Sequence, residues 1–366
     1  MKKLGFGTMR LELVNHDTKE INIDLFKQMI DCFMDAGYNY FDTAYTYLNG
    51  NSEKALKKAL VERHRRESFF LADKLPIFNL NNASEMEEIF NTQLKRCGVE
   101  YFDYYMLHNV STKHQSKFTD IDSFKFILNK KKEGKIRHIG ISCHDDAKFL
   151  DNILKKHPEI EFVQLQINYL DWNDEIIQSK ACYEVALEHD VDIIIMEPLK
   201  GGLMSYEDSD ILKEFDKHSS RKAVDLAFSF CKHLDNVMVV LSGMNNMSNL
   251  LENIRIFEDD KKLSEDDLEF LDRINRLMHS YDLIKCTGCN YCIDHCPKAI
   301  KIPDFLKLYN TQKTSKNHSV GMYYRNMITR YSSSPKDCIN CGNCTKFCPQ
   351  DIDIPKYMDE ITTLFK

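Results

Sequence analysis

The chain has little that would direct it to a membrane or to nucleic acid. No apolar run in its 366 residues approaches the ~20 residues that a membrane-spanning helix needs. The net charge is −7 at pH 7 and no sustained basic stripe is present, which argues against nucleic acid as the main partner. The opening residues MKKLGFGT are too short and too rich in glycine for an export signal, and thirteen cysteines without export indicate a reducing compartment. We therefore expect a cytoplasmic protein.

A second absence bears on the fold. Residues 5–10 read GFGTMR, so the G-x-G-x-x-G turn of a doubly wound dinucleotide-binding sheet is missing. Short apolar or β-branched runs nevertheless alternate with patterns of helical period, and the alternation repeats eight times. Such units predict an α/β fold with a closed (β/α)8 TIM barrel, and the doubly wound open sheet is the alternative. The strand candidates are residues 4–9, 38–44, 68–75, 102–108, 136–143, 162–168, 192–199 and 237–242.

Helix signals and a change in composition divide the chain. Residues 84–97 have helical period, and Ser84 with Glu87 predicts a capping box at their start. After residue 258 the composition changes, and residues 264–279 form one amphipathic pattern ahead of a cysteine-rich region. We expect three parts: a barrel at 1–258, a connecting helix at 259–280, and a small, mainly helical domain at 281–366.

Eight of the cysteines lie between residues 286 and 348, in two copies of one spacing. Each copy is C-x2-C-x2-C-x3-C-P, the run that binds two [4Fe–4S] clusters, in which the fourth cysteine of each run binds the cluster held by the other. Paired CxxC elements also make four-cysteine zinc sites, which is the alternative, but the complete spacing and the proline favour clusters. The first cluster is predicted at Cys286, Cys289, Cys292 and Cys348, and the second at Cys338, Cys341, Cys344 and Cys296.

Ionisable side chains accompany three successive strand candidates. Asp42 ends the second strand with Tyr47 five residues on, Lys74 ends the third, and His108 ends the fourth. The carboxyl ends of barrel strands meet at one mouth, where catalysis takes place in this fold. A phenol is a weak acid at neutral pH unless an ammonium stabilises its anion; a carboxylate can hold that ammonium, and an imidazole can orient a carbonyl. The set predicts acid-assisted chemistry on a carbonyl group.

The segment 41–53, FDTAYTYLNGNSE, is similar to the signature of the aldo/keto reductase family, and residues 4–9 resemble its first strand. The resemblance covers about residues 1–258. It implies an NAD(P)H-dependent oxidoreductase that acts on a small-molecule carbonyl or alcohol substrate. It also implies a catalytic tetrad of Asp42, Tyr47, Lys74 and His108, in which Tyr47 is the general acid.

The same resemblance implies where a dinucleotide binds. Ser142 and Gln164 are similar to the pair that holds the nicotinamide carboxamide, and the loop 197–202 is similar to the one that lies over the pyrophosphate. Glu252 and Asn253 resemble the adenine end. The implied cofactor-binding residues are Gly7, Thr8, Met9, Asp42, Ser142, Cys143, Gln164, Met196, Pro198, Leu199, Gly201, Gly243, Met244, Asn249, Glu252 and Asn253.

Several of these positions depart from the family pattern. Cys143 replaces a common asparagine, and Met196 stands where many relatives stack an aromatic ring on the nicotinamide. NADPH-specific relatives place a lysine within the segment that corresponds to residues 241–244, and often an arginine where this chain has Asn249. A 2′-phosphate normally binds such a cation, so the missing cations make NAD possible as the cofactor. Lys200 could also contribute positive charge, so NADP stays open as the alternative.

The predicted barrel and the predicted clusters transfer different numbers of electrons in one step. Hydride transfer moves two electrons and a cluster accepts one; a flavin normally mediates between them, and no flavin motif is evident. Helix-like stretches at 302–309 and 320–331 resemble the helical ferredoxin domain of succinate dehydrogenase-type subunits. We expect clusters for electron transfer, with an electron-transfer protein as a further partner. The alternatives are an enzyme that moves electrons between clusters and a nicotinamide or flavin, and a redox-sensing binding module that turns over slowly.

Overall fold

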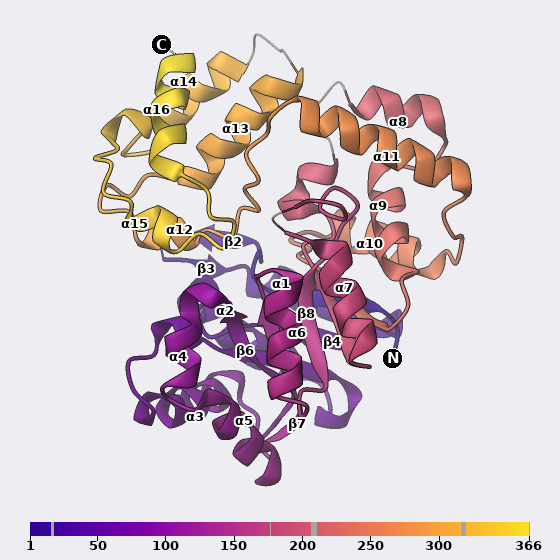
Figure 1. Ribbon diagram of the computed structural model, residues 1–366, viewed down its shortest axis with the longest axis vertical. Helices are drawn as coiled ribbons and strands as arrows, with labels where there is room; N and C mark the ends of the chain where they lie inside the picture. The colour runs from indigo at the N-terminus through magenta and orange to yellow at the C-terminus, as the bar shows by residue number, and fades with distance from the viewer. Residues whose placement is uncertain (16–17, 176, 206–210, 316–319, 366) are drawn as a thin grey trace. The chain divides into compact units, whose positions relative to one another are not determined.

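The computed structural model describes residues 1–366 except 16–17, 176, 206–210, 316–319 and 366. The chain divides into two compact units (Figure 1). The first comprises Met1–Pro198 and Phe228–Lys262, and the second comprises Leu199–Ala227 and Leu263–Lys366. These units are defined by contacts within the folded chain and not by independent folding. They therefore do not test the predicted division into a barrel, a connecting helix and a C-terminal domain.

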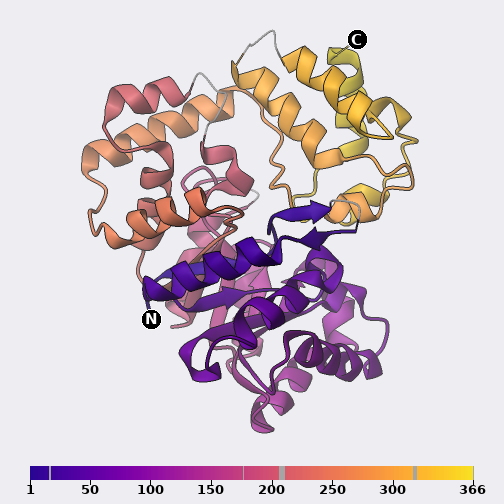
Figure 2. The same ribbon diagram turned by 180° about the vertical axis from the view of Figure 1, so that it is seen from behind.

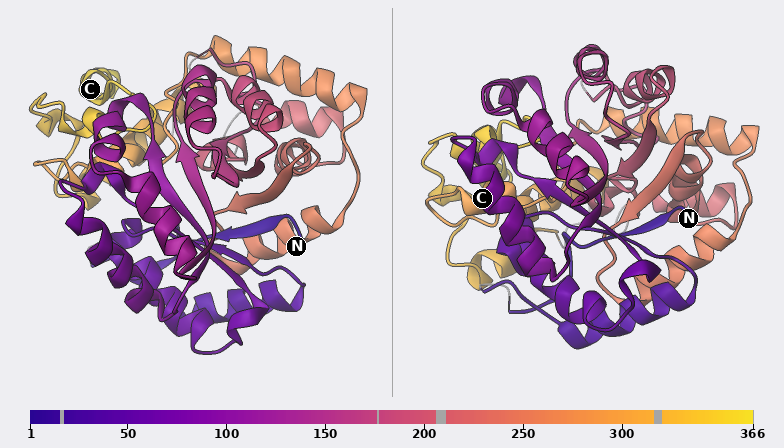
Figure 3. Two further views of the ribbon diagram at one scale, coloured as in Figure 1. Left: turned by 60° about the horizontal axis from the view of Figure 1, so that its bottom comes forward. Right: turned by 90° about the horizontal axis from the view of Figure 1, so that it is seen from below.

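The first unit contains a closed barrel of eight parallel strands, whose ring is enclosed by helices in Figure 3. The strands occur in the ring in the order β1-β10-β9-β8-β7-β6-β5-β4, so each strand lies beside the next barrel strand along the chain and the last closes on the first. The predicted barrel is confirmed, and the open sheet is excluded. The barrel strands are β1 (Leu4–Gly7), β4 (Tyr40–Asp42), β5 (Phe70–Leu75), β6 (Phe102–Val110), β7 (Ile136–Cys143), β8 (Phe162–Gln166), β9 (Asp192–Met196) and β10 (Val237–Ser242).

Apolar side chains fill the barrel, which explains why the strand segments read as nearly continuous hydrophobic runs. One cluster joins residues of six strands, among them Tyr40, Met106 and Val239. Gly5 admits these large neighbours, because an added Cβ there would lie 2.5 Å from a methyl of Val239. A short antiparallel pair, β2 (Leu13–Asn15) and β3 (Glu20–Ile21), follows the first barrel strand (Figure 2, indigo).

The helices begin close to where the sequence places them, with one difference at a cap. The predicted capping box at Ser84 is wrong: Ser84 is the first residue of its helix, and its hydroxyl donates to Asn82 Oδ1. Asn82 and Glu85 form this local network instead, so the cap signal lay two residues upstream. The helices that include residues of the first unit are α1 (Ile23–Asp35), α2 (Asn51–Leu56), α3 (Ser84–Cys97), α4 (Gln115–Thr119), α5 (Ser123–Lys132), α6 (Ala147–Lys156), α7 (Ser179–Glu188), α9 (Ala223–Lys232) and α10 (Met247–Glu258).

The second unit includes residues 281–366, which are mainly helical, as predicted. Its predicted connecting helix is α11 (Glu265–Ser280), which opens on a capping box between Ser264 and Asp267. Apolar side chains of α13 and α16, including Phe305 and Met358, form the core of its C-terminal part. The helices that the structure describes are each too short or too polar to cross a bilayer. The remaining helices are α8 (Leu212–His218), α12 (Tyr291–Asp294), α13 (Ile302–Ser315), α14 (Val320–Arg330), α15 (Asn343–Lys346) and α16 (Ile354–Leu364).

Candidate active site

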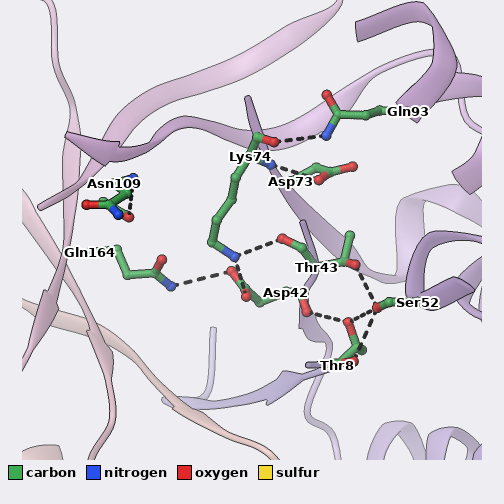
Figure 4. A network of polar contacts seen from close by, with 10 residues as sticks. Thr8, Asp42, Thr43, Ser52, Asp73, Lys74, Gln93, Asn109 and Gln164 are labelled. Carbon is green, nitrogen blue, oxygen red and sulfur yellow. Dashed lines mark hydrogen bonds and ion pairs between the residues drawn. The ribbon is translucent and has the colours of Figure 1, made fainter. Parts of the chain in front are cut away.

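A buried ion pair lies at the carboxyl ends of two neighbouring barrel strands (Figure 4). Lys74 of β5 donates from Nζ to Asp42 Oδ1 of β4 at 2.5 Å and to the carbonyl oxygen of Thr43 at 2.8 Å. Lys74 is 1% exposed and Asp42 is 2% exposed. Taking two charges out of water is costly unless each is paired and hydrogen-bonded, so this geometry fixes the ammonium at one point.

Tyr47 and His108 complete the predicted tetrad around this ammonium. The Lys74 Nζ atom lies 5.0 Å from the centroid of the Tyr47 ring, and the Tyr47 and His108 rings are 6.1 Å apart, edge to face. Tyr47 is half-buried while His108 is buried, so the phenol is the member that a small molecule can reach from solvent. The structure thus brings the four predicted side chains together at one mouth of the barrel.

Electrostatics hold the imidazole neutral. Burial lowers the pKa of His108 well below its ordinary value, and the nearby Lys74 ammonium lowers it further. Burial raises the pKa of Asp42, but the Lys74 ammonium and the Gln164 amide oppose that rise. A neutral imidazole therefore stands beside the Lys74–Asp42 ion pair.

A hydroxyl network behind Asp42 sets the loop that carries Tyr47 (Figure 4). Thr8 donates to the carbonyl oxygen of Asp42 at 2.8 Å, and the Ser52 hydroxyl lies 2.6 Å from Thr8 and 2.8 Å from that of Thr43. Thr8 and Ser52 are fully buried. Thr8 is one of the predicted cofactor-binding residues; in the structure its hydroxyl bonds to the strand end, and its contact with a cofactor stays a prediction.

The two residues predicted to hold a carboxamide are neighbours. Ser142 of β7 and Gln164 of β8 are register partners on adjacent strands. The backbone N–H of Asn109 donates to the Ser142 hydroxyl at 3.0 Å, and Gln164 Nε2 lies 3.5 Å from Asp42 Oδ2 (Figure 4). A hydroxyl and an amide stand side by side at the same mouth as the tetrad, which suits a ligand that both donates and accepts hydrogen bonds.

The other predicted cofactor positions differ in exposure. Cys143 and Met244 are buried, and buried Asn253 donates to the Ser242 hydroxyl at 2.8 Å, so these three side chains pack within the barrel unit. The other positions within this unit are half-buried or exposed, apart from Pro198, which is buried. They are Gly7, Met9, Met196, Gly243, Asn249 and Glu252, while Leu199 and Gly201 belong to the second unit.

Sequence reasoning missed an ion pair at this mouth. Arg10 pairs with Glu197 Oε1 at 3.0 Å, and an added Cβ at Gly243 would lie 3.6 Å from the Arg10 guanidinium. Arg10 therefore brings a cation beside Gly243, where the sequence alone offers none nearby. The sequence signal that could have found Arg10 is its position three residues after β1, because residues that follow the barrel strands lie at the mouth where the strands end.

A second missed feature is a buried carboxyl pair behind Lys74. Asp73, next to Lys74 in β5, has a pKa raised well above its ordinary value by burial and by the charge of Glu53. Burial raises the pKa of Glu53 to about 7, although Arg96 donates to its Oε2 at 2.9 Å. We interpret the pair as sharing one proton, because burial and mutual repulsion raise both pKa values despite the nearby Arg96.

The eight predicted cluster ligands gather into two cavities of the second unit. Each cavity is lined by three cysteines of one run and the fourth cysteine of the other, which is the crossed arrangement that the sequence predicts. Cys296, Cys338, Cys341 and Cys344 line one cavity, and Cys286, Cys289, Cys292 and Cys348 line the other.

These cavities fit clusters better than a lone metal ion. Four sulfur donors surround a largely apolar hollow, with Ile300 and Met358 in the wall of one and Leu306 and Ile352 in the wall of the other. Gly288 N–H donates to Cys286 Sγ at 3.4 Å, the type of bond that tunes a cluster. Each set of four cysteines is drawn from both runs, which is the sharing that paired clusters use and that a structural zinc site does not require, so the zinc alternative fits less well.

The chain matches two family models. Residues 3–276 match the aldo/keto reductase family, and residues 285–352 match a 4Fe-4S dicluster domain. Among curated proteins, the chain is 32% identical over 235 residues to the NADH-specific methylglyoxal reductase of Escherichia coli, a match that covers 56% of this chain and 69% of that protein. It is 25% identical to the 9,11-endoperoxide prostaglandin H2 reductase of Trypanosoma cruzi, covering 66% of this chain and 80% of that protein.

Solved structures show the same fold. The holo form of aldo-keto reductase AKR11C1 from Bacillus halodurans superposes with a TM-score of 0.61 at 23% identity, covering 74% of this chain and 91% of that one. An aldo/keto reductase from Klebsiella pneumoniae in complex with NADP and acetate gives 0.59 at 18% identity, covering 75% and 91%. At these identities the likeness concerns the fold.

Proposed function

The chain belongs to the aldo/keto reductase family of oxidoreductases, and from that premise we propose that its barrel reduces the carbonyl group of a small molecule with NAD(P)H. The single observation that carries the proposal is the Lys74 ammonium, held by Asp42 and by the carbonyl oxygen of Thr43, with the Tyr47 ring 5.0 Å away. A cation there favours the phenolate that remains once Tyr47 has given its proton to a carbonyl oxygen.

Each tetrad member has a separate role in this proposal. Tyr47 is the general acid, Lys74 stabilises its anion, and Asp42 fixes the ammonium. His108, kept neutral by burial, orients the carbonyl through a hydrogen bond without competing for the proton. Ser142 and Gln164, register partners on the neighbouring strands β7 and β8, would hold the carboxamide of a nicotinamide, which would supply the hydride when bound.

We further propose that the barrel accepts NADH at least as well as NADPH. Within residues 241–244 no cation is present, and the guanidinium beside Gly243, that of Arg10, is paired with Glu197. A neighbouring carboxylate weakens the attraction of that cation for a 2′-phosphate. Separate titrations with NADH and NADPH check this, and an NADPH affinity ten times the NADH affinity would contradict it.

For the C-terminal unit we propose two [4Fe–4S] clusters that pass single electrons to an electron-transfer protein. The two sets of four cysteines support this number. A second candidate function, electron exchange between the nicotinamide and the clusters, is favoured by the presence of the dicluster domain itself. Bleaching of the cluster absorbance by NADH without any carbonyl would support the second candidate. The redox-sensing module and the cytoplasmic location stay predictions.

The experiment that tests the first proposal is Tyr47→Phe in the anaerobically purified protein. Removing a general acid lowers kcat by about 10²–10⁴-fold while dinucleotide affinity stays the same. Tyr45→Phe is the matched control, because it removes a phenol hydroxyl from the same loop at a ring that packs against Arg96. Full turnover in Tyr47→Phe would refute the assignment, and negligible turnover of a broad carbonyl panel by the unmodified protein would favour the sensor.

A further inference from the structure

One peptide group in the second unit touches both a cluster ligand and the loop 197–202. The N–H of Gly288 donates to Cys286 Sγ at 3.4 Å. The carbonyl group at the other end of the same peptide, that of Thr287, faces Gly201: an added Cβ on Gly201 would lie 2.2 Å from the Thr287 oxygen and 2.6 Å from its carbonyl carbon. Gly201 and Thr287 both belong to the second unit, so this contact is internal to one compact body.

The contact is close. Thr287 is 4% exposed, while Gly201 itself is exposed on its other side. Gly201 has φ +66°, a left-handed conformation that glycine adopts without strain. Position 201 therefore favours glycine for two reasons: its backbone angle is left-handed, and a side chain would collide with the Thr287 carbonyl group.

The second cysteine run provides an internal comparison. Its corresponding peptide joins Ile339 and Asn340, in the same C-x2-C spacing and with a left-handed residue at the second position. Ile339 is 56% exposed, whereas Thr287 is 4% exposed. The loop of the first cluster is therefore covered at this peptide, and the loop of the second cluster is open to solvent there.

We propose that the Thr287–Gly288 peptide couples dinucleotide binding at the loop 197–202 to the redox state of the first cluster, the one assigned to Cys286, Cys289, Cys292 and Cys348. The inference rests on the proposed function, because it takes this loop to lie over the pyrophosphate. A peptide is planar and rigid, so a shift of the Thr287 carbonyl also moves the Gly288 N–H. Hydrogen bonds to cluster sulfurs set the reduction potential, so that movement changes the potential of the first cluster.

Thermodynamic linkage makes the effect reciprocal. If dinucleotide binding shifts the potential, reduction of the cluster must change dinucleotide affinity by the matching factor. A tenfold difference in affinity between the oxidised and reduced protein corresponds to about 59 mV for a one-electron couple. We expect a change of about this size for the first cluster and none for the second.

The test is a redox titration of the anaerobic holoprotein, followed by electron paramagnetic resonance, with and without ADP-ribose. ADP-ribose carries the pyrophosphate but no nicotinamide, so it cannot itself donate or accept hydride. The expected result is a shift of one cluster midpoint only, with a matching change in ADP-ribose affinity between oxidised and reduced protein. Midpoints that stay fixed, or that move together, would overturn the proposal.

Two alanine variants identify which cluster responds, in the absence of any ligand. Gly201→Ala pushes on the Thr287 carbonyl and should shift the midpoint of the first cluster. Gly202→Ala is the matched control, because Gly202 has φ +92° and no neighbour within 4 Å of an added Cβ. Equal effects of the two substitutions would mean that backbone strain alone is responsible. If Gly201→Ala does not fold, the ADP-ribose titration of the unmodified protein still decides.

The failure of this inference is distinguishable from failure of the proposed function. Absence of ADP-ribose, NADH and NADPH binding in equilibrium dialysis would remove the dinucleotide site itself. Binding that is equally tight to oxidised and reduced protein would leave the reductase proposal intact and remove only the coupling.

Discussion

The ion pair beneath the proposed acid gives a prediction with a calculable size. Lys74→Met removes the cation from a carboxyl group, Asp42, that is 2% exposed. Asp42 must then stay ionised without a partner or take up a proton. Protonating a carboxyl whose ordinary pKa is about 3.9 costs about 4 kcal/mol at pH 7, at 1.36 kcal/mol per unit. This agrees with the roughly 3–5 kcal/mol measured when one partner of a buried pair is removed.

The same reasoning fixes the pH dependence and its sign. In the variant, the folded protein holds a proton on Asp42 that the unfolded chain releases, so the folded pKa is raised above the unfolded one. The stability of Lys74→Met is therefore recovered as pH falls toward about 4, and is lost by about 1.4 kcal/mol per unit as pH rises. The deficit relative to the unmodified protein should be largest at neutral and alkaline pH.

Urea unfolding under anaerobic conditions measures this deficit. The chain has a single tryptophan, Trp172, which packs against Tyr183 and Phe230 in the barrel unit, so its fluorescence reports on that unit. Asp42→Asn combined with Lys74→Met is the control, because neither member of the ion pair can then titrate, so the pH dependence that Asp42 contributes to the deficit should disappear. A deficit in Lys74→Met that is constant between pH 5 and 8 would refute the reasoning.

Three further predictions follow from the site. Burial holds the pKa of His108 below its ordinary value of ~6.5, so near pH 6.5 the unfolded chain takes up a proton on this residue and the folded protein does not. As pH falls below about 6.5, the unmodified protein should therefore lose stability relative to His108→Gln. The opposite trend in urea unfolding would contradict this. Ser142→Ala removes a hydrogen-bonding hydroxyl worth about 1 kcal/mol, so the dissociation constant for NADH should rise about fivefold, and unchanged binding in a fluorescence titration would remove Ser142 from the cofactor site. Cys348→Ser should perturb the cluster held by the first run and Cys296→Ser the one held by the second, and paramagnetic resonance that shows the reverse assignment would exclude the crossed ligand sets.

The barrel and the tetrad were readable from sequence for a physical reason. Parallel barrel strands are buried on both faces, so they appear as separate apolar runs, and the polar residue that ends each run must reach the same mouth. Asp42, Lys74 and His108 follow that rule, and the structure places them together. The cysteine spacing is equally local, because four ligands with fixed intervals encode a site without knowledge of the fold.

Features that depend on long-range packing could not be predicted. Asp73 is adjacent to Lys74 in sequence, but its partner Glu53 comes from another segment, so the raised pKa values appear only when burial is known. Gly201 and Thr287 are 86 positions apart, and neither segment contains a sequence pattern that predicts their contact. The failed cap at Ser84 shows the opposite error, since a local motif was matched while Asn82 supplied the better acceptor.

The central claim is that the barrel transfers hydride to a carbonyl carbon, with Tyr47 giving the proton. The most direct test is a single turnover with NADH deuterated at its transferable position and a small carbonyl substrate that the protein turns over, followed by mass spectrometry of the product and by cluster absorbance. The account predicts one deuterium on the new carbinol carbon, no cluster bleaching, and loss of the reaction in Tyr47→Phe. Oxidation of NADH with bleached clusters and no deuterium in the product would contradict it.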